Sequence, residues 1–160
     1  CAAGDIDSSA QSVIDTINII TDLSQQLQGP AGDLSPTDPG AITTVTSGFT
    51  RITATITSDI TQFAKLQPFD AGCDADAVAL ALGKFVQAQQ TLLTTIIGKA
   101  GAFTKVPGAG EPVAAVLTAL GGVIDGISKG LIVLVPSDAC YTRQQTNSLV
   151  NTLNDATAAF

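Results

Sequence analysis

The side chains that most often perform catalysis are scarce in this sequence. Its 160 residues include no His, three Cys and one Tyr, against fourteen Asp or Glu and seven Lys or Arg. Without His, the chain lacks the usual general base, the commonest metal ligand and every catalytic triad that depends on an imidazole. We therefore predict no catalytic residue, no metal site and no cofactor, and we expect that the protein is not an enzyme.

Most of the carboxylates stand where helices are expected to begin. These acidic residues are Asp5, Asp7, Asp38, Asp74, Asp76 and Asp138. A carboxylate in such a place accepts hydrogen bonds from free backbone N–H groups and complements the helix dipole, so capping explains it without any further role. The acidic segment DAGCDAD lacks the spacing and closing Glu of a calcium loop. The segments GPAG and PGAG lack the pattern of a phosphate-binding loop.

The stretch 113–135, VAAVLTALGGVIDGISKGLIVLV, would be apolar on nearly every side if it formed a helix. We expect such a helix to be buried. Gly122, Gly126 and Gly130 stand four residues apart and form a strip without side chains. Each interior Gly costs a helix roughly 1 kcal/mol relative to Ala, so three of them indicate a packing or binding reason. The strip is interpreted either as a contact with a neighbouring helix or as a groove for an apolar ligand.

Asp125 and Lys129 are the charged residues of this stretch, and their spacing allows an ion pair on a solvated edge. Alternatively, Lys129 would bind the anionic head group of an amphiphile whose tail follows the glycine strip. Weaker head-group candidates, most of them expected at the surface, are Lys84, Lys99, Gln87, Gln89 and Gln90. Helix faces predict the following ligand-contacting residues: Gly122, Gly126, Lys129, Gly130, Leu120, Val123, Ile127, Phe49, Ile56, Phe85, Leu92 and Ile96.

Hydrophobic periodicity predicts the helices that would position these residues. The predicted helices span residues 5–28, 39–66, 74–102, 111–135 and 137–159. Within the second range, TRITATIT alternates like a strand, but the apolar residues from Ile42 to Leu66 keep a helical step over about 25 residues. The chain is therefore predicted to be an all-α, single-domain bundle of about five helices with a highly apolar fourth helix.

Capping and stop signals mark the boundaries of these helices. The segment GPAGDLSPTDPG reads as a loop. Asp38 followed by Pro39 is a typical helix start. Asp74 or Asp76 is expected to cap the third helix, and Ser137 or Asp138 the last.

Composition excludes several partners. Hydrophobic residues make up 45% of the chain, 13% of residues are charged, and the net charge is −7. An acidic chain with scattered Lys and Arg lacks the basic patch that nucleic-acid binding requires, so no nucleic-acid partner is expected. Asp125 and Lys129 interrupt the best candidate for a membrane span, and a bundle without a transmembrane span is therefore preferred.

The three cysteines, Cys1, Cys73 and Cys140, allow three pairings. Cys73 and Cys140 both lie near predicted helix starts, and we predict a disulfide between them. Cys1 is left over in this interpretation, and an N-terminal Cys could also carry a lipid. Cysteines together with a surface rich in Ser and Thr favour a secreted protein.

Several patterns together resemble the fungal hydrophobic-surface-binding protein and cell-wall galactomannoprotein family. They are the segment from Val13 to Leu23, the Thr-rich segment from Ile42 to Leu66, the Asp-Ala-Asp-Ala run from Asp74, and the late apolar helix that closes on Val135-Pro136. The resemblance spans nearly the whole chain without a diagnostic motif. It implies a secreted helical bundle, extracellular or in the cell wall, that binds fatty acids in an apolar tunnel.

Three functions are compatible with these features. The first is a secreted, non-enzymatic carrier that binds a fatty acid or similar amphiphile in an apolar cavity between helices. The second is a surface-active or cell-wall structural protein that adsorbs to hydrophobic surfaces. The third is a ligand-free interaction or effector domain recognised by another protein.

Overall fold

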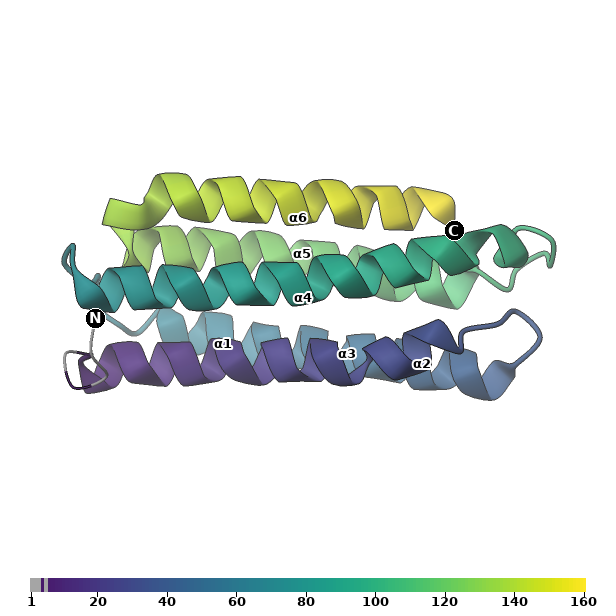
Figure 1. Ribbon diagram of the computed structural model, residues 1–160, viewed down its shortest axis with the longest axis horizontal. Coiled ribbons are helices and arrows are strands. Elements are labelled where there is room, and N and C mark those ends of the chain that lie inside the picture. The colour runs from purple at the N-terminus through teal and green to yellow at the C-terminus, as the bar shows by residue number, and fades with distance from the viewer. Residues whose placement is uncertain (1–3, 5) are drawn as a thin grey trace.

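The computed structural model describes residue 4 and residues 6–160, and over these residues the chain is helical and contains no strand (Figure 1). The elements in chain order are α1 (Ser8–Gln26), α2 (Gln28–Gly32), α3 (Pro39–Phe63), α4 (Cys73–Phe103), α5 (Glu111–Leu134), the 3₁₀ helix η2 (Pro136–Asp138) and α6 (Ala139–Ala159). The predicted all-α bundle with a highly apolar fourth long helix is confirmed.

The five long helices form a ring around one core. α4 packs against α1 and α6, α5 packs against α3 and α6, and a smaller contact between α1 and α3 completes the ring. The helices run side by side along an elongated molecule, and α1 begins at the opposite end from the end of α6 (Figure 1). Each helix has one apolar stripe, so this ring lets all the stripes meet in a single interior.

The helix with the most buried residues is α4, and not the more apolar α5. α4 carries the longest series of buried residues, and it packs against α1, α2 and α6. The core that these helices share is mainly aliphatic, with Phe49 and Phe85 fully enclosed. Close packing of Leu, Ile, Val and Ala side chains therefore supplies most of the contacts that hold the bundle together.

The expectation that residues 113–135 would be buried on all sides is wrong. α5 has long neighbours on two sides only, α3 and α6. Its opposite face is open to solvent, and it includes Ala115, Thr118, Gly122 and Val133, which is 62% exposed. The buried stripe of α5 consists of Val113, Leu117, Leu120, Ile124, Ile127, Leu131 and Leu134.

α5 is long and apolar enough to cross a membrane by length and composition, and 28% of its most apolar 18-residue window is buried in the bundle. The buried stripe that it shares with the core makes α5 an integral part of the ring. The mostly small side chains on its outer face explain how so apolar a helix leaves one side uncovered.

α3 shows why a Thr-rich segment can be helical. Its Thr hydroxyls donate hydrogen bonds back to carbonyl groups one turn earlier, as Thr55 does to Arg51 at 2.8 Å and Thr57 does to Thr53 at 2.9 Å. Such bonds satisfy the hydroxyl within the helix. The buried stripe at Val45, Phe49 and Ile52 sets the helical period, so the helix predicted across TRITATIT is confirmed.

The predicted loop GPAGDLSPTDPG begins too early. Residues 28–32 form the short helix α2, and the connection to α3 covers residues 33–38. Pro30 lies in the first turn of α2, where no intrahelical N–H is needed. The buried side chains of Ala31 and Leu34 anchor the segment to the core. The first predicted helix is accordingly divided at Leu27.

Helix capping follows the prediction at one start and departs from it at two. Asp38 accepts a hydrogen bond from the Ala41 N–H at 3.1 Å, with Pro39 as the first residue of α3, as predicted. α4 instead begins at Cys73 after Gly72, whose φ of 142° favours glycine, and no side chain caps it. α6 begins at Ala139 without a side-chain cap, because the preceding residues are turned into η2.

The predicted disulfide between Cys73 and Cys140 is wrong, because Cys140 is a free, exposed cysteine. Both residues do lie near helix starts at the same end of the molecule. Cys140 stands two residues before Thr142, the first buried residue of α6, and two residues turn a helix by about 200°. Its side chain therefore faces away from the core. Cys1 lies outside the described residues.

Replacing Asp38 with Ala should lower the free energy of unfolding by about 1 kcal/mol, because the Ala41 N–H loses its side-chain acceptor. Urea unfolding followed by circular dichroism measures this change. Asp33→Ala, at the exposed end of α2, is the matched control for loss of a loop carboxylate. Equal stability of the two variants would contradict the capping role of Asp38.

Candidate functional site

The predicted aliphatic and aromatic contact residues meet in the interior of the ring. Each of them is at most 1% exposed and belongs to the same core cluster. They are Phe49, Ile56, Phe85, Leu92, Ile96, Leu120 and Ile127. α3, α4 and α5 therefore supply apolar walls to one shared interior, which can hold only groups with little need for water.

The glycine strip of α5 is not part of that interior. Gly122 is exposed, and a Cβ built on Gly122 or on Gly130 would meet no atom within 4 Å. A Cβ on Gly126 would lie 2.9 Å from Ile60 Cδ1, so Gly126 does allow close approach of α3. Val123 is half-buried at the edge of the core. The strip thus combines one helix contact with two open positions.

Lys129 lies on the solvated face of α5. Its Nζ is 2.9 Å from Asp125 Oδ2, and the two side chains are 76% and 65% exposed. A hydrogen bond to Asp125, followed by the charge of that carboxylate, raises the pKa of Lys129. The interpretation as a solvated ion pair therefore describes the geometry, and Lys129 does not reach the interior.

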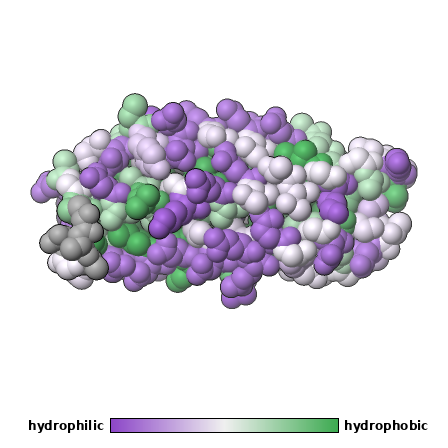
Figure 2. Space-filling view, in the orientation of Figure 1, coloured by the Kyte–Doolittle hydropathy of each residue, from purple (hydrophilic) through white to green (hydrophobic). Residues whose placement is uncertain are grey.

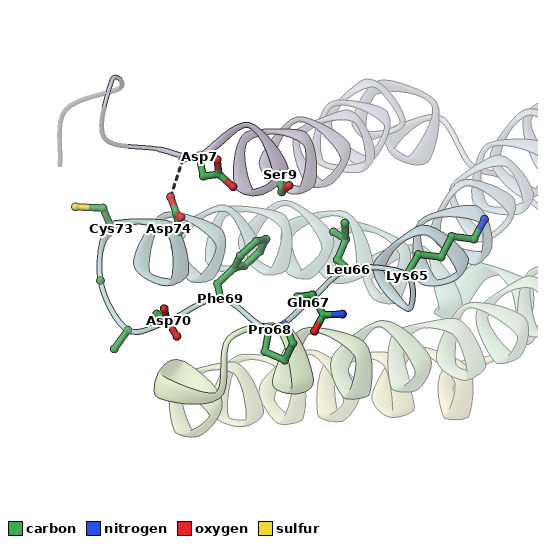
Figure 3. A pocket seen from close by; sticks show the side chains of 12 residues that line it. Asp7, Ser9, Lys65, Leu66, Gln67, Pro68, Phe69, Asp70, Cys73 and Asp74 are labelled. Carbon is green, nitrogen blue, oxygen red and sulfur yellow. Dashed lines mark hydrogen bonds between the residues drawn. The ribbon is translucent and has the colours of Figure 1, made fainter.

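The two ends of the interior differ. At the end where α6 terminates, the rings of Phe103 and Phe160 meet edge to face with centroids 5.2 Å apart. At the other end, the connection between α3 and α4 borders a hollow of about 560 Å³ (Figure 3). Its floor includes Leu66 and Phe69, which pack against the core. A smaller hollow of about 340 Å³ borders Phe103 and Phe160 at the opposite end, so each end of the bundle carries a recess.

Two backbone hydrogen bonds fix the connection that borders this hollow. The Phe69 N–H donates to the Leu134 carbonyl at 2.7 Å, which ties the connection to the end of α5. The Asp7 N–H donates to Asp74 Oδ1 at 2.9 Å, which ties the start of α1 to α4 (Figure 3). The Asp74 carboxylate therefore joins two helices instead of capping its own.

A groove of about 330 Å³ runs between α1 and α4. Ile14, Ala77 and Leu80 form its apolar part, and Lys84 and Asp76 border it. Leu80 is 58% exposed, although it belongs to the most buried helix. Most of the face shown in Figure 2 is polar, with small separate apolar patches, the most prominent near the start of α1.

The interior also contains a carboxyl group. Asp59 occupies a place on the buried stripe of α3, between Ile56 and Phe63, and it is 4% exposed. Its Oδ2 is buried and, among the described residues, has no hydrogen-bond partner. Burial raises the pKa of Asp59 from its ordinary 3.8 to about 6. Such a group is costly in an apolar core unless something satisfies it.

A second polar group crosses the core between α1 and α4. Gln89 belongs to a set of polar residues of which most were expected at the surface, and it is fully buried. Its amide nitrogen donates to Ser24 Oγ at 2.6 Å, and the Ser24 hydroxyl donates to the Ile20 carbonyl at 2.8 Å. Because the Ser24 hydrogen is committed, Ser24 must accept from Gln89. Gln89 Oε1 is consequently left as a buried acceptor without a partner.

Sequence reasoning missed Asp59 because the acidic residues were interpreted together as caps. The signal was nevertheless present, since residue 59 is three positions after Ile56 and four before Phe63, which places it on the apolar face of the helix. Ile60, which the hydrophobic pattern places on that face, is half-buried against Gly126.

The chain has the fold of AFMP4P, as seen in a crystal structure of that protein in complex with palmitic acid. The superposition has a TM-score of 0.85 and covers 94% of this chain and 98% of the other, with 18% sequence identity. No protein-family model matches the chain, and no curated protein matches it. At 18% identity the likeness establishes the helical fold and does not relate individual interior residues of the two proteins.

Taken together, the interior offers long aliphatic walls and isolated hydrogen-bond acceptors. Among the described residues, no group of three or more His, Cys, Asp or Glu is placed to hold a metal ion. Core side chains occupy this interior in the structure, so an extended apolar chain would be enclosed only after helices move apart, and it would then meet Asp59 and Gln89 as polar groups.

Replacing Gly122 or Gly130 with Ala should raise the free energy of unfolding by about 1 kcal/mol each, because Ala has the higher helix propensity and the added Cβ meets open space. Gly126→Ala should gain less, since Ile60 has to move. Thermal unfolding of the three variants checks this order. A loss of stability in Gly122→Ala would mean that the open face is occupied in the folded protein.

The raised pKa of Asp59 makes stability depend on pH. Between about pH 4 and pH 6 the unfolded chain has lost the Asp59 proton while the folded chain retains it, so stability falls as pH rises through this window. Asp59→Asn should abolish that part of the fall and be more stable near neutral pH by roughly 2 to 3 kcal/mol. Urea unfolding from about pH 4 to pH 8 measures both curves.

The difference between the pH–stability curves of wild type and Asp59→Asn gives the contribution of Asp59 apart from that of other carboxyl groups. Burial, followed by the neighbouring Asp76 carboxyl, also raises the pKa of Asp138, and this contribution remains in both proteins. Asp22→Asn removes the same charge from an exposed position on α1 and controls for net charge. Parallel curves for wild type and Asp59→Asn would contradict the burial of an ionisable Asp59.

Proposed function

We propose that this protein binds a long-chain aliphatic amphiphile, such as a fatty acid, inside the ring of helices and that it acts as a carrier rather than an enzyme. The observation that carries the proposal is structural. A protein with the same fold over nearly the whole of both chains forms a complex with palmitic acid. The continuous aliphatic core from α3, α4 and α5 supplies the kind of surface such a ligand requires.

The proposal extends to the setting of the protein. The sequence patterns that resemble the fungal hydrophobic-surface-binding and cell-wall galactomannoprotein family favour a secreted protein, extracellular or in the cell wall. The acidic, Thr-rich surface is compatible with that setting. The disulfide expected from Cys73 to Cys140 is not formed, because Cys140 is a free thiol, but Cys73 is disulfide-bonded, which is compatible with that setting.

Entry of a ligand requires the helices to separate, because core side chains fill the interior. Two features favour separation on one side of the ring. The contact between α1 and α3 is the smallest among neighbouring long helices. The hollow beside Leu66 and Phe69 brings solvent to the end of the same two helices. We therefore place the entry at the start of α1 and the end of α3.

A second candidate function is adsorption to hydrophobic surfaces. The observation that favours it is the outer face of α5, where an apolar helix presents Ala115, Gly122 and Val133 to solvent. The Asp125–Lys129 pair interrupts this face. Adsorption would use the outside of the molecule, whereas the carrier function uses its interior, so the two can be separated by substitution.

Delipidated protein is expected to take up palmitic acid with fixed stoichiometry, because the aliphatic interior removes the acyl chain from water. Native mass spectrometry of the protein mixed with palmitic acid gives the stoichiometry, and isothermal titration calorimetry gives the affinity. Binding should be accompanied by a negative heat-capacity change, the mark of apolar burial. Absence of both an adduct and a heat signal would overturn the carrier proposal.

Two surface variants serve as controls for this experiment. Lys129→Ala should leave palmitic acid binding unchanged, since Lys129 is exposed and paired with Asp125. Val133→Ser, on the outer face of α5, should also leave it unchanged but should reduce adsorption to octyl-coated beads if that face is the adsorbing surface. Adsorption without stoichiometric binding would favour the second function, and neither activity would favour a ligand-free interaction domain.

A further inference from the structure

Asp59 occupies a position that the helical pattern of α3 reserves for an apolar side chain. The buried residues of this part of the helix are Ile52, Ile56, Asp59 and Phe63, which follow one another at steps of three and four. Asp59 is therefore directed toward the shared interior of the ring, and it is 96% removed from solvent. A surface role for this carboxylate is excluded by that geometry.

Asp59 lacks a balancing cation in the part of the chain that the structure describes. Among the described residues Asp59 forms no ion pair, and burial is the cause of its altered protonation, without a contribution from a neighbouring charge. Gly126 of α5 lies against Ile60, the neighbour of Asp59. The charged residues of α5 nearest to Gly126 along the chain, Asp125 and Lys129, pair with each other on the outer face. Asp59 Oδ2 thus remains an acceptor that lacks a donor.

Gln89 presents the same deficit from α4. Its amide nitrogen is used by Ser24, and its Oε1 is buried without a donor. Buried polar atoms are nearly always satisfied in folded proteins, and each one that is not costs stability. Two helices that contribute to the interior, α3 and α4, therefore each present an acceptor that a bound molecule could satisfy.

We propose that the interior selects long-chain amphiphiles whose head group donates a hydrogen bond, a fatty alcohol or a long-chain primary amine, and that Asp59 accepts that hydrogen bond. This inference rests on the proposed function, since it assumes that the interior binds an acyl or alkyl chain. It adds the chemistry of the head group and the residue that recognises it.

The head-group preference follows from charge and hydrogen bonding. A carboxylate ligand would bring a second negative charge toward Asp59 with no cation to compensate it, which is unfavourable in a medium of low dielectric constant. A hydroxyl supplies the missing donor. An ammonium group supplies the donor and the opposite charge, and charge-assisted hydrogen bonds of this kind are about twice as strong as neutral ones.

The test compares three ligands with the same hexadecyl chain length: palmitic acid, hexadecanol and hexadecylamine. Their affinities for delipidated protein are measured by displacement of a fluorescent fatty-acid probe near neutral pH. Wild-type protein is expected to bind hexadecylamine and hexadecanol about tenfold or more tightly than palmitic acid. Asp59→Leu should lose this preference and should bind palmitic acid at least as well as wild type does.

Two further variants make the result specific to Asp59. Asp59→Asn removes the charge, retains one acceptor and adds an N–H₂ donor for a carboxylate, so it should lose most of the preference for hexadecylamine and narrow the preference for hexadecanol over palmitic acid. Asp22→Asn removes an exposed carboxylate from α1 and should behave as wild type. Circular dichroism establishes that each variant is folded before its affinities are compared.

The outcomes separate this inference from the proposed function. If palmitic acid binds best and Asp59→Leu does not alter the order, the head-group inference fails while the carrier function stands. If none of the three ligands displaces the probe or binds directly, both fail. Loss of the alcohol and amine preference in Asp59→Leu alone, with the control unchanged, supports the inference.

Discussion

The fold depends on the burial of one apolar stripe from each of five helices in a common interior. Each long helix packs against two neighbours in the ring, so its apolar stripe is covered from two sides. The hydrophobic effect is non-directional, so it favours the closed arrangement without fixing the order of the helices. That order comes from the short connections, such as residues 33–38 and the turn at Gly108, which join neighbouring elements. Charged and Thr-rich faces then lie outside by necessity.

Helical periodicity was sufficient to predict an all-α bundle of about five helices, but not the order of the helices in the ring. The apolar step in α3 extends over enough residues to outweigh the strand-like alternation of TRITATIT, because Thr hydroxyls can bond to carbonyls of their own helix. Smaller features depended on tertiary contacts that the sequence does not display. α2 is anchored by Ala31 and Leu34 in the core. α4 begins at Cys73, one residue before Asp74, so the Asp74 carboxylate lies within the first turn and bonds to the start of α1.

The candidate site was predictable in its walls and not in its polar groups. Phe85, Leu92 and Ile96 follow from hydrophobic spacing, and the structure places them in the interior. The glycine strip was interpreted as a helix contact or a ligand groove, and of its three members Gly126 makes a helix contact, because equal spacing along a helix does not say which face meets a neighbour. Gly126 meets Ile60, whereas the adjacent Gly121, outside the strip, lies against Leu153. Asp59 was overlooked as a site residue. An acidic residue on the apolar face of a helix indicates a buried polar group, whereas one at a helix start is explained by capping.

The odd number of long helices has a mechanical consequence. α1 begins at one end of the molecule and α6 finishes at the other (Figure 1). α4 has 31 residues, which corresponds to a length of about 46 Å. Pulling on the two ends would therefore load the α1–α4 and α4–α6 contacts in shear along the helix axes, so that many side chains resist together. Copies joined head to tail would extend as a chain of rods rather than fold back on one another.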